Sequence, residues 1–183
     1  MTKQPKTLKK IRPFEEILQS YREIIRESDM FISLQQELTK YRNEIYNIRC
    51  LAIGSFSDDF PAKYQLALLL ELIKFLTEED KTIRVSVYDP IFTETDLKYI
   101  KTHQPTWKTT EIVDKKTFSP ESTLFFLPHA PLDLTEFILK DEEPRIYLAN
   151  NIDQHTHRYT KFQLYEKYTI LSKLKHVLEE SKN

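Results

Sequence analysis

The chain has 183 residues, 40% of them hydrophobic, and this length suits one domain with a single core rather than a multidomain enzyme. It contains one glycine and one cysteine, which excludes an internal disulfide and argues against the glycine-rich loops that cradle phosphates and dinucleotides. The formal net charge is -1, but it is unevenly spread, because residues 1–12 carry five cations and no acid.

The sequence shows no sign of a membrane or secretory segment. No run approaches the roughly 20 apolar residues that a membrane span requires, and no apolar run follows the lysine-rich amino terminus as it would in a signal peptide. The single cysteine, Cys50, fits a reducing compartment. We therefore expect a soluble, cytoplasmic protein that makes no membrane contact.

The first twelve residues predict a basic arm that is separate from the folded body. Its cations are Lys3, Lys6, Lys9, Lys10 and Arg12. A short polycationic arm on an acidic domain is a common means of contacting nucleic acid. The same composition also suits a solvated tail that only keeps the protein soluble, and the charge count does not separate these two interpretations.

Residues 13–48 have the spacing of two amphipathic helices. Apolar side chains recur every three or four residues over 14–25 and again over 31–45. Pro13 suits a first helical turn, and Ser28 offers an N-cap between the two helices. We predict a helical hairpin; in the alternative, its apolar stripes receive a partner protein instead of packing on the rest of the chain.

Short apolar runs alternate with helical segments over residues 49–152, and a loop and helix over 153–183 close the chain. The runs predict strands over 49–53, 83–88, 123–127 and 145–148, with a weaker strand over 110–113. Helices are predicted over 64–76, 93–102, 132–140 and 162–180, and a polar exposed loop over 103–121. Thr93 and Asp96 have the spacing of a capping box at the start of the second of these helices. Residues 13–183 are thus predicted to form a single α/β domain: a Rossmann-like, mostly parallel sheet with helices on both faces and an amino-terminal helical hairpin.

Polar residues follow the predicted strands, at the edge where ligands bind in open α/β sheets. These residues are Gly54, Ser55, Asp89, His129 and Asn150. They predict a polar pocket in which Asp89 has the place where Rossmann domains hold a ribose hydroxyl. Asp58 and Asp59 would repel a pyrophosphate at the next helix, so NAD and FAD are disfavoured and we predict no cofactor. In the competing interpretation these residues only cap helices and form turns.

No catalytic constellation accompanies this pocket. Ser55 or Ser57 could act as a nucleophile beside His129, but the glycine-flanked serine of hydrolases is missing. Cys50 lies in a predicted strand, where a small core residue is expected rather than an activated thiol. His155 and His157 lack the thiolate or carboxylate neighbours of a metal site. We therefore predict a protein that is not an enzyme and that holds no metal.

The closing segment interleaves cations with aromatic side chains. Arg158, Lys161 and Lys167 alternate with tyrosines and a phenylalanine. Cations supply affinity for phosphates, and aromatic rings stack on unpaired bases. The pattern predicts contact with structured RNA rather than DNA; in the alternative, the helically spaced aromatic residues belong to the core.

Four short blocks give the chain a family resemblance. They are Ala52-Ile53-Gly54-Ser55-Phe56-Ser57, Tyr64-Gln65-Leu66-Ala67-Leu68-Leu69, Val87-Tyr88-Asp89-Pro90-Ile91-Phe92 and Leu124-Phe125-Phe126-Leu127-Pro128-His129. In order and spacing these blocks resemble the sensitivity-to-red-light-reduced family over residues 49–152. The resemblance implies a eukaryotic regulatory domain without established catalytic residues. Many members have a cysteine where this chain has Ala130, so a thiolate-assisted heme or metal site is not implied here.

The chain is short for that family and rich in lysine, isoleucine and tyrosine, which makes it similar to a compact member known from microsporidia. That member is a ribosome dormancy factor, which occupies the transfer-RNA exit site. The resemblance therefore implies a dormancy (hibernation) factor that sterically blocks this site and inhibits translation, with ribosomal RNA and ribosomal proteins as partners. The alternative is a small-ligand-binding regulatory protein or an enzyme that uses the pocket near Gly54, Asp89 and His129.

Overall fold

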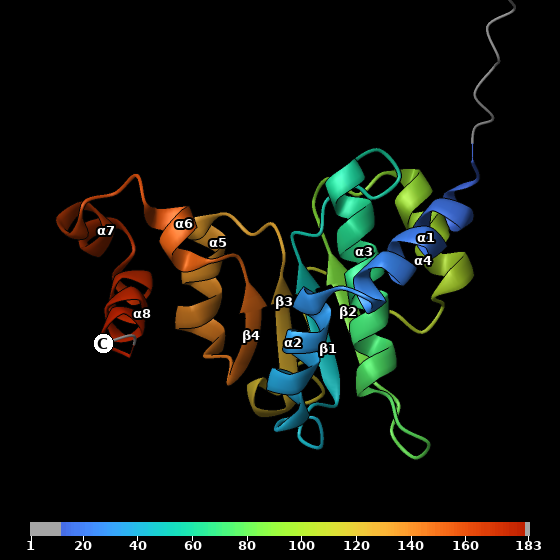
Figure 1. Cartoon of the computed structure of the whole chain (residues 1–183), viewed down its shortest axis with the longest axis horizontal. Coiled ribbons are helices and arrows are strands. Elements are labelled where there is room, and N and C mark those ends of the chain that lie inside the picture. The colour runs from blue at the N-terminus through green and yellow to red at the C-terminus, as the bar shows by residue number, and fades with distance from the viewer. Residues whose placement is uncertain (1–11, 182–183) are drawn as a thin grey trace, which may run out of the picture.

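The computed structural model describes residues 12–181, which form a parallel sheet surrounded by helices (Figure 1). The strands β1 (Asn47–Leu51), β2 (Arg84–Tyr88), β3 (Thr123–Leu127) and β4 (Ile146–Ala149) pair in the order β2-β1-β3-β4, all parallel. The helices are α1 (Phe14–Arg26), α2 (Asp29–Thr39), α3 (Phe60–Leu76), α4 (Glu94–His103), α5 (Leu132–Phe137), α6 (Ile152–Thr156), α7 (Lys161–Lys167) and α8 (Thr169–Glu180). The predicted α/β fold with a parallel sheet is confirmed.

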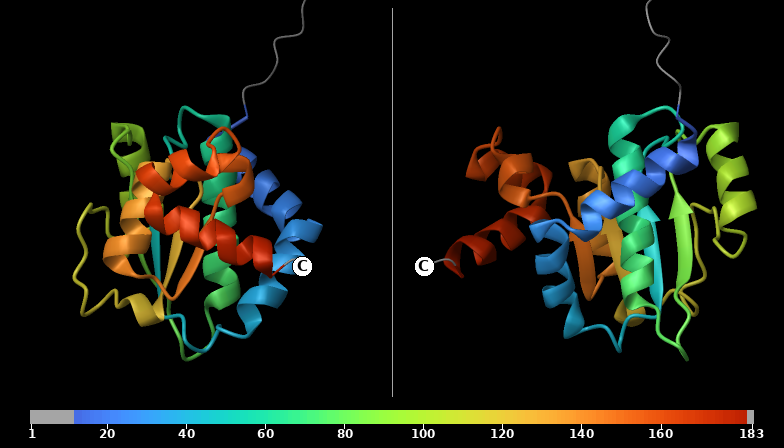
Figure 2. Two further views of the ribbon diagram at one scale, coloured as in Figure 1. Left: turned by 90° about the vertical axis from the view of Figure 1, so that its left-hand side faces the viewer. Right: turned by 45° about the vertical axis from the view of Figure 1, so that its right-hand side comes forward.

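The first face of the sheet carries the larger hydrophobic core. Ile48 is aligned with Val85 on one side and with Leu124 on the other, and all three side chains are buried in one cluster. Helices α1, α2 and α3 lie over this face of the sheet (Figure 2). Helices α1 and α2 contribute their apolar stripes to the same cluster, with Leu18 and Phe31 buried. The buried side chains of the hairpin therefore pack on the sheet and α3 of this chain.

A buried ion pair ties α1 to α3. Glu71 of α3 is 2% exposed, and its carboxylate lies 2.7 Å from Arg22 Nε and 3.1 Å from Arg26 Nε. Burial alone would raise the pKa of Glu71, but the hydrogen bonds from the two arginines outweigh burial and hold the pKa below its usual range. The two arginines therefore stabilise the charged carboxylate of Glu71 within the largely apolar interface between α1 and α3.

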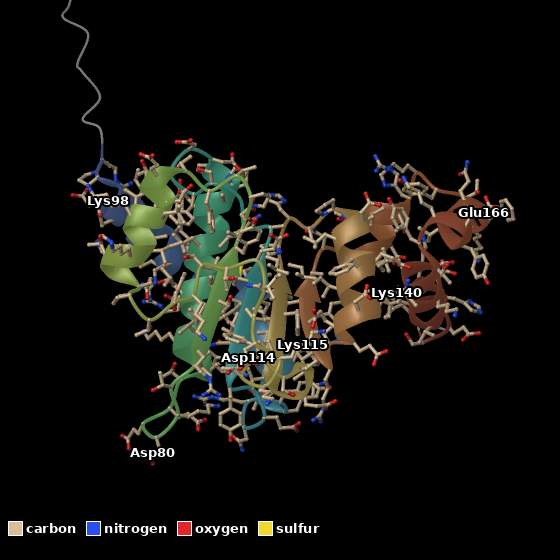
Figure 3. All side chains as sticks on the ribbon, turned by 180° about the vertical axis from the view of Figure 1, so that it is seen from behind. Asp80, Lys98, Asp114, Lys115, Lys140 and Glu166 are labelled. Carbon is tan, nitrogen blue, oxygen red and sulfur yellow. The ribbon has the colours of Figure 1, made fainter. Side chains whose placement is uncertain are left out.

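The second face of the sheet is covered differently. Arg49 is aligned with Ser86 and with Phe125 on this face. Helix α5 covers the β3 side of the face, whereas residues 104–119 cross the β1 and β2 side without a helix. Figure 3 shows this crossing segment in front of the strands, with Asp114 and Lys115 labelled. The second face is therefore closed by irregular chain over half its width.

The prediction of a weak strand over residues 110–113 was wrong. Within the crossing segment 104–119, only Lys108 pairs with the sheet, in an isolated parallel bridge to Ser86. The carbonyl oxygens of Thr110 and Glu111 instead accept hydrogen bonds from the Arg49 side chain. Because a side chain uses the acceptors that a neighbouring strand would need, the segment does not extend the sheet.

Two predicted helices end earlier than their apolar spacing suggested. The second helix was predicted to reach residue 45 but ends at Thr39, and Tyr41 and Ile45 pack on the core from a turn. The predicted N-cap of this helix, Ser28, is confirmed, since its side chain accepts the N–H of Phe31. The helix predicted over 132–140 becomes a π-helical turn after Phe137. Burial in turns can thus imitate helical spacing.

The single helix predicted over 162–180 is two helices, and residues 152–156 of the predicted loop region form α6. The break between α7 and α8 falls at Tyr168, whose backbone angles are φ -138° and ψ 76°. The Glu136 carboxylate of α5 accepts the N–H groups of Ile170 and Leu171, both at 2.8 Å. This long-range cap starts α8 in a new direction and attaches it to α5.

Candidate functional site

A cavity of about 780 Å³ lies on the second face of the sheet, beneath the crossing segment. We call it the sheet cavity. Its walls are mostly apolar: Leu51, Tyr88 and Phe125 from the strands, Ile112 and Val113 from the crossing segment, and Leu134, Phe137 and Ile138 from α5 and the following turn. This volume is within the range of sites that bind small molecules. The cavity exists because irregular chain, not a helix, covers this part of the sheet.

Three of the five predicted pocket residues line the sheet cavity, and two do not. Gly54, Asp89 and His129 lie at its end near the carboxyl edge of the sheet. Ser55 is buried and bonded elsewhere, and Asn150 lines a separate cavity of about 330 Å³ beside α6 and α8. The convergence predicted at the strand ends is therefore partial.

Asp89 connects the two loops that follow β1 and β2. Its carboxylate accepts the N–H of Gly54 at 2.7 Å and the N–H of Ile91 at 3.0 Å. Gly54 has φ +83°, and a Cβ added there would lie 3.0 Å from Ala62 Cβ. Glycine is required at this position because the left-handed backbone and the close approach of α3 both exclude a side chain. Asp89 thus shapes the loop that carries the glycine.

Ser55 is held by a carboxylate, not by a histidine. Its hydroxyl donates to Asp96 Oδ2 at 2.7 Å, and the N–H of Ser57 donates to Asp96 Oδ1 at 2.8 Å. Asp96 also accepts the N–H of Thr93, which completes the predicted capping box of α4. Hydroxyls bound in this way cap and connect loops, and nothing in this arrangement activates Ser55 as a nucleophile.

Sequence reasoning missed Arg49, the cation of the sheet cavity. Its side chain is buried, with 3% of the residue exposed. The guanidinium donates to Ser86 Oγ at 2.6 Å, to the Thr110 carbonyl at 2.7 Å and to the Glu111 carbonyl. Burial lowers the pKa of Arg49. One feature of the sequence could have identified Arg49: it is the lone cation inside the apolar run of β1.

Neither thiol nor metal chemistry is visible among the described residues. Cys50 is fully buried on the first face, and burial strongly raises the pKa of its thiol, which leaves it neutral and unreactive. Nowhere in residues 12–181 do three or more His, Cys, Asp or Glu side chains gather as a metal site requires.

A second candidate site lies on the carboxyl-terminal lobe, which we define as residues 157–180. Tyr159 is flanked by two cations: the Arg158 guanidinium is 5.2 Å and the Lys167 ammonium 5.9 Å from its ring centroid. The Lys167 ammonium also lies 5.2 Å from the ring of Tyr168. An open hollow of about 560 Å³ is lined by this cluster together with Gln163 and Glu166. Two of the three predicted RNA-binding cations of this segment therefore meet on one aromatic platform.

The lobe also exposes aromatic rings that its own core does not use. Phe162 is 69% exposed and Tyr165 is 55% exposed, while Leu164 between them is buried. Lys161, the third predicted cation, lies 3.3 Å from Glu179 and is partly neutralised by it. Figure 3 shows α7, with Glu166 labelled, at the far end of the molecule. These rings are free to meet flat ligands such as bases.

The predicted basic arm falls mainly on residues that the structure does not describe. Lys3, Lys6, Lys9 and Lys10 lie outside residues 12–181, whereas Arg12 is exposed and bonds the Glu16 carbonyl at 3.2 Å. Helix α1, which follows Arg12, and helix α7 lie at opposite ends of the long axis (Figure 1). Arg12 and the carboxyl-terminal lobe therefore do not form one patch.

Comparison with known proteins gives a consistent result. The SRR1 domain family matches residues 18–183 of the chain. An SRR1-like protein of Drosophila melanogaster is 28% identical over 135 residues, which is 68% of this chain and 47% of the fly protein. The chain thus spans about half the length of that curated relative. No solved structure matches.

Across residues 12–181, every helix is too short or too polar to cross a membrane.

Proposed function

The chain belongs to the SRR1 domain family, and on that basis we propose that it is a ribosome-binding dormancy factor that blocks the transfer-RNA exit site and so inhibits translation. It acts by occupying space, without a catalytic step. The observation that carries this proposal is the cation-aromatic cluster of the carboxyl-terminal lobe, where Arg158 and Lys167 flank Tyr159.

The chemistry of this cluster fits ribosomal RNA. Arg158 and Lys167 supply positive charge for phosphates, and the exposed rings of Phe162 and Tyr165 offer faces on which unpaired bases stack. Cations that already lie against aromatic rings are partly ordered before they meet a ligand, which lowers the entropic cost of binding. The exposed rings of Phe162 and Tyr165 do not belong to the core of the lobe, which is formed by Leu164, Tyr168 and their neighbours, with Tyr159 packed against it.

The distribution of charge supports contact through both ends of the chain. Residues 1–12 carry five cations and no acid, and residues 157–183 carry six cations and three acids. The intervening residues 13–156 carry 16 cations and 25 acids, a net charge of -9. Ribosomal RNA repels such a body and attracts its ends, which favours one orientation in a site lined by RNA.

Co-sedimentation with ribosomes from the same organism, in dormant and in growing cells over a series of salt concentrations, tests the proposal. We expect stoichiometric binding in dormant cells that weakens with salt. Replacing Arg158 and Lys167 together by Gln should reduce the slope of log affinity against log salt by about 1.5, the value for two lost phosphate contacts. Phe162→Ser should weaken binding without changing that slope, because stacking on a base involves no counterion.

The matched control is Lys98→Gln with Lys101→Gln on α4, which removes the same charge at the opposite end from α7 (Figure 3). This variant should retain the slope of the unmodified protein. Equal slopes for the two double variants would remove the lobe from the RNA contact. Protein that stays at the top of every gradient would overturn the ribosome proposal as a whole.

The sheet cavity favours the alternative function, a small-ligand-binding regulatory protein. The cavity is large enough for a ligand, and the predicted residues Gly54, Asp89 and His129 line it. An enzyme is less well supported, because Ser55 is bonded to Asp96 and Asp89 to backbone N–H groups. Ligand binding and ribosome binding use separate surfaces, so both can be tested on the same protein.

A further inference from the structure

The starting point is the environment of Arg49, the buried cation of the sheet cavity. Its three hydrogen bonds all go to neutral acceptors, one hydroxyl and two carbonyl oxygens. Within residues 12–181 no carboxylate forms an ion pair with its guanidinium. Charged side chains are almost never fully buried without a partner charge, because removal from water strongly penalises an ion. Arg49 therefore places a buried positive charge, without a salt bridge among these residues, at the wall of a cavity.

The acids that line the sheet cavity form no salt bridge with Arg49, although Glu142 and Glu111 interact with its charge. Each is engaged elsewhere or faces solvent: Glu142 pairs with Lys115 at 3.1 Å, Asp89 accepts two backbone N–H groups, and Asp59 and Glu111 are exposed. Among the described residues, the cavity has one other lysine or arginine, Lys115, and its ammonium pairs with Glu142. Among residues 12–181, Arg49 is thus the buried cation of the cavity: Glu142 and Glu111 interact with its charge, but neither forms a salt bridge with it.

We propose that the sheet cavity binds an amphipathic organic acid, whose anionic group contacts Arg49 and whose apolar body lies between the sheet and α5. Arg49 has five N–H donors, and the three bonds above use two on Nη1 and one on Nη2. The Nε–H and the second Nη2–H take part in none of these bonds. A planar anion such as a carboxylate matches two donors of this kind.

The walls of the cavity determine the rest of the ligand. Tyr88 and Phe125 line it from the strands, and Phe137 and Ile138 line it from the opposite side. Ile112 of the crossing segment also lines the cavity, yet it is 82% exposed. A flat apolar body would cover these side chains, and burial of their area would add to the affinity. A ligand with a charge but no apolar body would leave them exposed.

A matched pair of fluorescent dyes tests both halves of the proposal. 8-Anilinonaphthalene-1-sulfonate carries one anionic group, and N-phenyl-1-naphthylamine has the same aromatic body without it. On the full-length folded protein we expect one dye molecule per chain, with the anionic dye bound about tenfold more tightly, since its sulfonate accepts a hydrogen bond from a charged group. Equal affinities would overturn the role of Arg49, and this comparison needs no variant.

Substitutions then locate the anion. Arg49→Met should remove the preference for the anionic dye and leave the affinity for the neutral dye within about twofold, whereas Arg49→Lys should retain part of the preference. Lys115→Met removes the other cavity cation and should change neither affinity, because Lys115 already pairs with Glu142. Phe137→Ser should weaken both dyes. A preference that survives Arg49→Met, or that is lost with Lys115→Met, would contradict the assignment.

Discussion

At the scale of single residues, Asp96 shows how one carboxylate can hold several loops. It is completely buried and accepts hydrogen bonds from Ser55, Ser57 and Thr93, so the loop after β1 and the start of α4 share one acceptor. Burial alone would raise the pKa of Asp96, but these hydrogen bonds outweigh it and hold the pKa below its usual range. The ionised form is therefore the one that the fold requires.

This lowered pKa predicts how stability depends on pH. A group with a depressed folded-state pKa stabilises the fold above its unfolded-state pKa, about 3.9 for Asp, and the stabilisation is lost as the pH falls through the folded-state value. Asp96→Asn should therefore lower the free energy of unfolding by about 2 kcal/mol at pH 7, and the difference from the unmodified protein should shrink below about pH 4. Urea unfolding at pH 7, 5, 4 and 3 measures this. Asp80→Asn, in an exposed turn, is the control and should leave the curve unchanged.

At the scale of elements, the attachment of α1 to α3 depends on a few long-range contacts. Apolar packing supplies most of the contact, and the ion pairs of Glu71 with Arg22 and Arg26 fix its register. The two arginines are partly exposed, so water can solvate them if the carboxylate is removed. The cost of losing Glu71 should then be smaller than for a fully buried pair.

Glu71→Ala tests this attachment. We expect a loss of about 2 kcal/mol in the free energy of unfolding, below the roughly 3–5 kcal/mol for one partner of a fully buried pair. Hydrogen exchange should show faster opening of α1 than of the sheet, because the variant loosens the outer helix first. The control Glu16→Ala removes the exposed contact between Arg12 and Glu16, at 4.0 Å, and should have no measurable effect. Equal effects of the two variants would mean that Glu71 does not join the helices.

At the scale of the whole molecule, charge is separated along the long axis. The basic lobe lies at one end, α1 with Arg12 lies at the other, and the body between them is acidic. The ribosome binding that we propose would therefore use the ends of the chain, because the acidic middle repels RNA. Two separated contacts on one rigid ligand also strengthen each other, because the first contact raises the effective concentration of the second.

Deleting residues 1–12 tests the contribution of the arm to ribosome binding. The deletion removes Lys3, Lys6, Lys9, Lys10 and Arg12. If every cation contacts a phosphate, the slope of log affinity against log salt should fall by up to about 4. A chain that keeps the arm but carries Gln at these five positions should match the deletion. An unchanged slope in both chains would assign all RNA contact to the rest of the molecule.

The sequence by itself determined the local features of this protein. The alternation of apolar runs with helical spacing predicted the parallel sheet and its helices. Such a prediction is possible because the spacing of apolar residues along each strand or helix shows which of its side chains are buried. The caps at Ser28 and at Thr93 were equally predictable, since a cap joins residues two or three positions apart. Family membership also followed from blocks of adjacent residues.

Only the tertiary structure decided which distant groups meet. Arg49 bonds Thr110 more than sixty residues away, which prevents a strand there and leaves the sheet cavity open. Glu136 caps α8 from α5 and thereby divides one predicted helix into two. Of the predicted strand-end residues, Ser55 donates a hydrogen bond to Asp96 and does not line the cavity. Each outcome depends on a hydrogen bond between segments far apart in the chain, and no local periodicity encodes such a bond.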